Sequence, residues 1–197
     1  MSRLSGFRGP LVSSALIVTV LVGLTACAPQ AGTGPAPAPT EQSVSGDIPD
    51  NQVFITVSGE SGAFAVNVPE GWASSSAGGV TTYTDKLNSV SFGQSAVDAA
   101  PSVDTLSSQL DHFTSGTGNP TGAEVTAVTT AVGDAFHIAY EADSAAGSVT
   151  GKVHRDAVAV YVFWRVGQQV ELTLKGPVTA DNVDPWKIVS DSFHWTA

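Results

Sequence analysis

The four histidines are the side chains best suited to acid–base chemistry near neutral pH, so their positions decide whether they can act together. His112, His137, His154 and His194 fall in four different predicted elements. His137 and Glu141 lie four residues apart in a predicted strand, which places them on one face about 13 Å apart, too far to share a metal ion directly. We therefore expect neither a catalytic histidine nor a metal site here.

A second candidate group consists of the acidic residues around Trp186. Asp181, Asp184 and Asp191 are the densest carboxylates near an aromatic side chain, an arrangement that can bind a cation or a sugar. An aspartate at a helix start also satisfies free backbone N–H groups and the helix dipole, worth about 1 kcal/mol. We favour capping, by Asp184 in particular, over a ligand site.

The sequence lacks the common motifs of nucleophilic, nucleotide and metal chemistry. It contains no Gly-x-Ser-x-Gly elbow, Walker-type loop, dinucleotide fingerprint or Cys/His metal spacing. The segment 59–62 (GESG) comes nearest to the elbow, but it has the wrong spacing and falls between two short predicted strands. We interpret it as a turn, and we expect no catalytic residues and no cofactor.

Cys27 is the only cysteine, and its surroundings indicate covalent modification. Two arginines precede the apolar segment 11–24, whose 14 residues are too few to span a bilayer comfortably and are typical of a signal peptide. Residues 24–27 (LTAC) then resemble the lipobox of bacterial lipoproteins, in which the thiol accepts a diacylglyceryl group. We therefore expect residues 1–26 to be a lipoprotein signal peptide and Cys27 to become the lipidated N-terminus.

The alternative is ordinary cleavage after Ala28, because residues 26–28 (ACA) also form an A-x-A pattern. Pro29 would then follow the cut bond and constrain it, which favours the lipobox. A diacylglyceryl group carries two acyl chains, enough for stable anchoring where one chain gives only transient contact. The lipid on Cys27, palmitate among its acyl chains, would hold the protein on the extracytoplasmic face of the cell membrane.

Composition changes sharply after the predicted cleavage site. Residues 27–52 are rich in Pro, Ala, Gly and Ser without hydrophobic periodicity, which predicts a semi-extended tether of at most roughly 80 Å. Residues 53–197 have the size of one globular domain. Without the signal peptide the chain keeps 6 of its 8 basic and all 18 acidic residues, a net charge of −12 that argues against nucleic acid as a partner.

Hydrophobic periodicity predicts a domain made mainly of strands with two helices. Strands are expected at 53–57, 64–68, 80–84, 90–94, 125–132, 136–141, 148–153, 156–166 and 170–174, with a two-residue turn at 133–134. Helices are expected at 103–113, capped by Ser102, and at 180–193. Residues 156–166 are apolar on both faces and belong inside a sheet covered on both sides, whereas 170–174 has one apolar face and belongs nearer an edge.

Three segments carry a family resemblance: 64–72 (FAVNVPEGW), the apolar strand that leads into 172–174, and 181–195 (DNVDPWKIVSDSFHW). Together they resemble an actinobacterial lipoprotein family whose domain is a PsbP-like, LpqN-type α/β/α sandwich. The resemblance covers nearly all of residues 53–197. It implies an α+β fold with a mostly antiparallel sheet and helices on both faces, and an adaptor or binding role without catalytic residues.

We therefore expect a membrane-anchored extracytoplasmic lipoprotein that serves as a non-catalytic binding or accessory module of the cell envelope, with an envelope protein or a glycan as partner. Two alternatives stay open: an envelope hydrolase whose site is assembled from dispersed residues, and a small-molecule carrier with a pocket between helix and sheet. The hydrolase predicts converging titratable groups, the carrier a deep apolar cavity, and the partner-binding module an exposed apolar patch.

Overall fold

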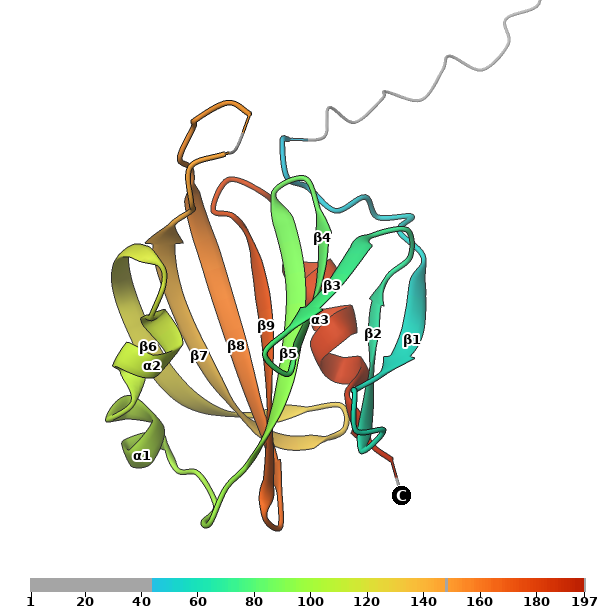
Figure 1. Cartoon of the computed structure of the whole chain (residues 1–197), viewed down its shortest axis with the longest axis vertical. Coiled ribbons are helices and arrows are strands. Elements are labelled where there is room, and N and C mark those ends of the chain that lie inside the picture. The colour runs from blue at the N-terminus through green and yellow to red at the C-terminus, as the bar shows by residue number, and fades with distance from the viewer. Residues whose placement is uncertain (1–43, 148, 197) are drawn as a thin grey trace, which may run out of the picture. The chain divides into compact units, whose positions relative to one another are not determined.

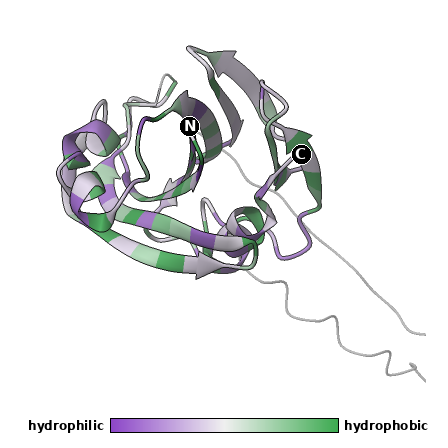
Figure 2. Ribbon diagram, turned by 90° about the horizontal axis from the view of Figure 1, so that it is seen from below, coloured by the Kyte–Doolittle hydropathy of each residue, from purple (hydrophilic) through white to green (hydrophobic). Residues whose placement is uncertain are grey.

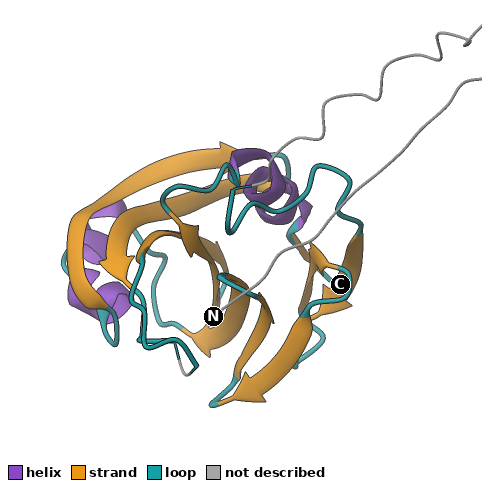
Figure 3. Ribbon diagram, turned by 90° about the horizontal axis from the view of Figure 1, so that it is seen from above, coloured by secondary structure: helices purple, strands orange, loops and turns teal. Residues whose placement is uncertain are grey.

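A computed structural model of the protein describes residues 44–147 and 149–196. Its largest element is a seven-stranded sheet in the order β3-β4-β5-β9-β8-β7-β6, in which all neighbouring strands are antiparallel (Figure 1). The strands are β3 (Ala73–Ala77), β4 (Val80–Asp85), β5 (Asn88–Ala96), β6 (Gly118–Thr130), β7 (Gly133–Asp143), β8 (Arg155–Arg165) and β9 (Gln168–Pro177). Seen from above, the sheet is strongly curved (Figure 3). The predicted α+β class is confirmed.

One face of this sheet is covered by a small second sheet and the C-terminal helix. The small sheet has the order β1-β2-β10, from β1 (Phe54–Ser58), β2 (Phe64–Pro69) and β10 (His194–Trp195), and the helix is α3 (Val183–Ser192). Val66 of β2 and Val189 of α3 belong to one buried cluster with Phe163 of β8 and Leu172 of β9. The apolar side chains of both sheets thus meet around α3.

The opposite face carries two short helices, α1 (Val103–Ser107) and α2 (Leu110–Thr114). Leu106 and Phe113 from these helices form a second buried cluster with Ile138 of β7 and Val160 of β8. Strand β8 contributes side chains to both clusters, because alternate side chains of a strand point to opposite faces of the sheet. Val160 faces α1 and α2, whereas Ala159 and Phe163 face α3. The predicted arrangement of helices on both faces and an interior strand at 156–166 is confirmed.

Strand β9 lies in the middle of the seven strands, so the prediction that residues 170–174 lie near an edge is wrong. The second apolar cluster contains residues of β6, β7 and β8 but none of β9. Helices α1 and α2 therefore bury no apolar side chain of β9. The side chains on that face, Glu171, Thr173 and Lys175, are polar and only partly buried, so they need no apolar partner. Hydropathy alternates along the strands accordingly (Figure 2).

The predicted helix at 103–113 is broken into α1 and α2. Ser102 caps α1 as expected, in a capping box in which its side chain accepts from the Thr105 backbone and the Thr105 hydroxyl accepts from the Ser102 backbone. At the end of α1, the Ser108 hydroxyl donates to the Thr105 carbonyl at 2.6 Å. A serine that bonds to a neighbouring carbonyl offers the backbone an alternative to the helix, which explains the break.

Three further differences concern turns and short strands. The described residues 144–147 and 149–154 form a loop, so the strand predicted at 148–153 is absent from 149–153. The turn between β6 and β7 is formed by 131–132 and not by 133–134, because Thr130 and Gly133 are already paired. The Ala/Ser-rich strand β3 and the two-residue β10 were not predicted; every residue of β3 is exposed, so it has no hydrophobic alternation to detect.

Buried side chains fix the start of α3 to the N-terminal part of the described chain. Asn182, directly before the helix, accepts the Ile48 backbone N–H at 2.8 Å and donates to the Gly46 carbonyl at 3.1 Å and to Asn88 Oδ1 at 3.0 Å. The Asn88 amide donates to the same Gly46 carbonyl at 2.7 Å. Gly46 and Ile48, which the composition placed in the tether, therefore pack into the domain.

Candidate functional site

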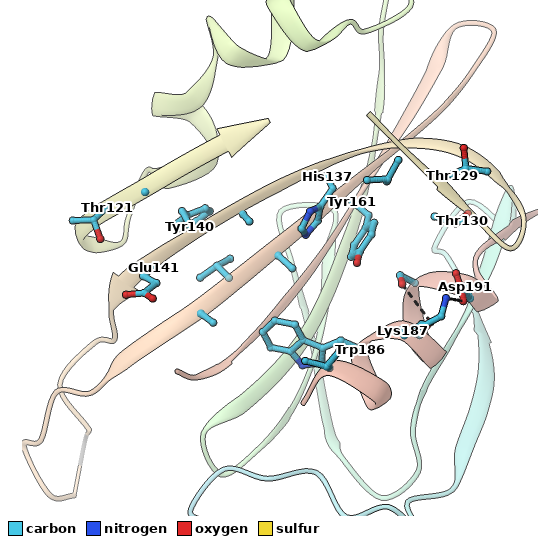
Figure 4. Close-up of a pocket in the computed structure, with 18 residues that line it drawn as sticks. Thr121, Thr129, Thr130, His137, Tyr140, Glu141, Tyr161, Trp186, Lys187 and Asp191 are labelled. Atoms are coloured by element: carbon cyan, nitrogen blue, oxygen red, sulfur yellow. Dashed lines mark hydrogen bonds and ion pairs between the residues drawn. The ribbon is translucent and has the colours of Figure 1, made fainter. Parts of the chain in front are cut away.

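A cleft of about 760 Å³ lies between α3 and the sheet (Figure 4). We call it the helix–sheet cleft. Its lining residues are Thr121, Gly122 and 128–130 of β6, His137 and 139–141 of β7, 157–159 and Tyr161 of β8, and Val183, Trp186, Lys187, Ser190 and Asp191 of α3. This volume lies within the range of about 300–1,000 Å³ typical of small-molecule sites.

The floor of the cleft is hollow because short side chains meet on two neighbouring strands. Ala139 of β7 pairs with Ala159 of β8, and Glu141 pairs with Ala157. Directly opposed residues of paired strands have Cβ atoms about 5 Å apart, so the methyl groups of Ala139, Ala157 and Ala159 leave space above the sheet. The register of β7 on β8 therefore creates the cavity.

Three aromatic side chains border the floor. His137 pairs with Tyr161 across β7 and β8, and their ring centroids are 4.8 Å apart. Trp186 reaches from α3 across the short side chains of the floor, while His137 and Tyr161 lie side by side (Figure 4). Burial lowers the pKa of His137 below its ordinary value of 6.5, so this imidazole is neutral at pH 7.

The end of the cleft beside α3 carries an ion pair. Lys187 bonds to Asp191 one helical turn later, and Asp191 also accepts the Ala131 backbone N–H at 3.1 Å. The hydrogen bond from Lys187, followed by that from Ala131, lowers the pKa of Asp191, while Asp191 raises the pKa of Lys187. The two charges are thus compensated by each other.

The other end of the cleft is held by Arg155. Its guanidinium contacts Asp143 at 3.1 Å and Glu141 at 3.4 Å, and it donates to the Asn119 carbonyl at 2.8 Å and to the Thr121 hydroxyl. The pKa of Asp143 is lowered first by the Asn119 side chain and then by Arg155. Arg155 therefore joins the start of β6 to β7 and β8, and its positive charge compensates the negative charge of Glu141.

The histidines lie on separate elements, as predicted. His137 and Glu141 share a face and both line the cleft. His112 of α2 contacts Glu171 at 3.4 Å on the other face, and the exposed His194 lies on β10. Within residues 44–147 and 149–196 no group of three or more His, Cys, Asp or Glu side chains is arranged to hold a metal ion.

His154 belongs to a Ser–His–Asp arrangement that was not predicted. Its Nδ1 lies 3.0 Å from the Ser144 hydroxyl, and its Nε2 lies 3.0 Å from Asp156 Oδ1 without the alignment of a hydrogen bond. Burial raises the pKa of Asp156, against the opposing effects of His154 and of Lys175 at 3.8 Å. The sequence spacing of Ser144, His154 and Asp156 does not predict this arrangement, because Ser144 and His154 come together only at the base of a loop.

Backbone contacts explain this arrangement as a loop closure. The Ser144 hydroxyl accepts the His154 backbone N–H at 3.1 Å, and the Ser144 N–H donates to the His154 carbonyl at 2.9 Å. None of the three residues lines the helix–sheet cleft. We therefore interpret them as a clamp at the base of the loop that joins β7 to β8.

The acidic residues around Trp186 do not converge. Asp181 donates its backbone N–H to Asp47 at 3.0 Å, and Asp191 is paired with Lys187. Asp184 is exposed in the first turn of α3, where Asn182 is the capping residue and makes no side-chain cap bond. The interpretation of Asp184 as the helix cap is therefore wrong.

Cys27 and the predicted signal peptide, residues 1–26, lie outside the described residues. The part of the chain that the structure describes contains no helix long and apolar enough to cross a membrane.

Comparison with known proteins shows the fold. No family model matches the sequence, and no curated protein matches it. The PsbP protein of the cyanobacterium Synechocystis sp. PCC 6803 is similar with a TM-score of 0.50 and 14% identity, over 83% of this chain and 100% of that one. The domain has a PsbP-like fold. The Ran-binding protein Mog1p of Saccharomyces cerevisiae is similar with a TM-score of 0.51 and 14% identity, over 73% and 95% of the two chains.

Proposed function

We propose that the protein is a lipid-anchored, extracytoplasmic binding module without catalytic activity, and that the helix–sheet cleft is its ligand site. The cleft carries the proposal, because it combines a small-molecule volume, an apolar floor and aromatic borders in one place. The lipobox around Cys27 and the resemblance to actinobacterial lipoproteins support the envelope location. An envelope protein or glycan partner would have to place a group in this cleft.

The features of the cleft favour binding over hydrolysis. Catalysis of acyl transfer needs a nucleophile, a base and donors for the oxyanion around one point of a pocket. In the described cleft, Lys187 and Asp191 neutralise each other, Glu141 is engaged by Arg155, and His137 faces an aromatic ring. Of the two alternatives that the sequence leaves open, these features support the small-molecule carrier more than the envelope hydrolase.

Filling the floor of the cleft tests the ligand site. Ala139→Leu/Ala157→Leu adds side-chain volume at two half-buried floor positions, whereas Ala127→Leu adds it at an exposed β6 position outside the cleft. An organic-solvent extract of the cell envelope should raise the melting temperature of the wild type and of Ala127→Leu, but not that of the filled variant. An equal shift in all three proteins, or none in the wild type, would refute the site.

Metabolic labelling tests the anchor. Cys27→Ser should abolish incorporation of labelled palmitate and release the protein from membranes, because the thioether has no other thiol on which to form. A variant that still labels and still sediments with membranes would refute the lipid anchor and leave the cleft proposal standing.

A further inference from the structure

The borders of the helix–sheet cleft are aromatic rings that lie around a floor of alanine side chains. His137 and Tyr161 stand side by side with an angle of 34° between their rings, and Trp186 stands across the alanine floor on α3 (Figure 4). A flexible aliphatic chain fits any apolar groove, but aromatic rings add an offset-stacked or edge-to-face contact for another ring. The aromatic borders of the cleft thus favour a planar ligand.

Each of the three aromatic residues also offers a polar atom at its edge. The Tyr161 hydroxyl, the Trp186 indole N–H and the ring nitrogens of His137 make no hydrogen bond to any other described residue, and none of them is a fully buried unsatisfied atom. A ligand that covers these groups must replace their water, and leaving such a group unpaired costs binding free energy. The ligand should therefore carry oxygen or nitrogen atoms at its edge.

The charges at the cleft are already compensated. Lys187 is paired with Asp191 and Glu141 with Arg155, and burial keeps His137 neutral at pH 7. A charged ligand that enters an apolar cleft loses its hydration, and only a free opposite charge restores that loss. Among the described lining residues every charged side chain has such a partner, so the cleft disfavours a formal charge on the bound ring.

We propose that the helix–sheet cleft binds an uncharged planar ring compound with hydrogen-bonding atoms at its edge, of the phenol, quinone or neutral heteroaromatic class. This inference rests on the proposed function and adds the class of ligand to it. It also separates the site from one for a sugar, since sugar rings require many directional polar contacts and the floor here is built from Ala139, Ala157 and Ala159.

Four probes separate the possible ligand classes. 2-Naphthol is an uncharged ring with a hydroxyl at its edge, 2-naphthoate is the matched anion, dodecanol is an uncharged flexible chain, and chitotriose is a neutral glycan. Each is titrated into the ¹⁵N-labelled full chain, and the four tryptophan indole N–H signals are followed by NMR. Trp→Phe variants assign the signals, and Trp164, half-exposed on the opposite face of β8, serves as the internal control.

We expect 2-naphthol to move the Trp186 signal and leave the Trp164 signal in place, with a dissociation constant on the order of 0.1–1 mM for so small a compound. 2-Naphthoate should bind at least tenfold more weakly. Ala139→Leu/Ala157→Leu and Tyr161→Phe should each weaken 2-naphthol binding, the first by filling the floor and the second by removing only the hydroxyl. Ala127→Leu should bind as the wild type does.

Tighter binding of dodecanol, of chitotriose or of the anion at Trp186 would overturn the ring-ligand proposal. So would 2-naphthol binding that is unchanged by filling the floor, or the absence of any shift at Trp186. These results leave the proposed function standing as long as the envelope extract stabilises the wild type and not the filled variant. If the extract also fails to do so, both proposals fail.

Discussion

The buried amide of Asn182 makes the sharpest prediction about stability. Its side chain is 5% exposed and forms three hydrogen bonds, to the Ile48 N–H, the Gly46 carbonyl and Asn88 Oδ1. Asn182→Ala removes all three. The Gly46 carbonyl keeps its bond from Asn88, but the Ile48 N–H and Asn88 Oδ1 lose their partners.

The expected cost follows from those two groups. A buried donor or acceptor left without a partner costs about 1–3 kcal/mol, so Asn182→Ala should lower the free energy of unfolding by about 4 kcal/mol. Asp184→Ala is the matched control two residues later. Asp184 is exposed and acts only through the helix dipole, which is worth about 0.3–1 kcal/mol.

Urea unfolding followed by tryptophan fluorescence measures both variants. The same experiment on residues 53–197, without 44–52, provides a further control, because that chain lacks the Gly46 and Ile48 partners. There Asn182→Ala should cost clearly less than in a chain that begins at Val44, since the residues in one network are not additive. An Asn182→Ala cost within about 0.5 kcal/mol of wild type, with a larger loss in Asp184→Ala, would refute the network and restore Asp184 as the cap.

Three further variants test other parts of the fold. Burial raises the pKa of Asp156 above its ordinary 3.8, so the folded protein binds this proton more tightly than the unfolded chain does. The free energy of unfolding of the wild type, relative to that of Asp156→Asn, should therefore be highest near pH 3 and fall as the pH rises to about 7. A relative stability that rises over this range would contradict the prediction. Gly176→Ala should lower stability by about 1–3 kcal/mol in urea unfolding, because its Cβ would lie 2.3 Å from Asn88 Oδ1. Trp186→Ala should cost less than the roughly 3 kcal/mol of a fully buried tryptophan, since its side chain is only partly buried at the cleft.

Local patterns were sufficient for much of the fold. Residues 156–166 are apolar on both faces, and this alone indicates an interior strand between two layers. The position of β9 was beyond such reasoning, because its polar outer face depends on how far α1 and α2 extend over the sheet. Coverage by elements distant in sequence is a tertiary property that hydropathy does not contain.

The cleft shows the same limit more clearly. His137 was recognised as a candidate, but its partner Tyr161 and the pair Ala139 and Ala159 meet only through the register of β7 on β8. The described residues between these two strands form a loop, whereas the sequence predicts a strand at 148–153. Short side chains give no signal of their own in a sequence, so the cavity that they create was visible only in the structure.

The way α3 is held explains why the cleft stays open. Before its first turn, Asn182 is tied to Gly46 and Ile48. Directly after its last turn, Phe193 stacks on Phe163 of β8 with ring centroids 3.8 Å apart, and it is buried. Both ends are therefore fixed, so α3 cannot shift as a whole toward the alanine floor. Between the two ends, Val189 packs into the buried cluster and Trp186 borders the cleft.

This arrangement has a consequence for binding. A cleft held open by its scaffold does not have to be formed when the ligand arrives, so little ordering free energy is lost on association. One of the two supports of α3 comes from residues 46–48, which in the proposed lipoprotein are the part of the domain nearest in sequence to the anchored Cys27. Weakening that support, as Asn182→Ala does, should therefore reduce 2-naphthol binding under conditions where the domain is still folded, whereas Asp184→Ala should leave binding unchanged.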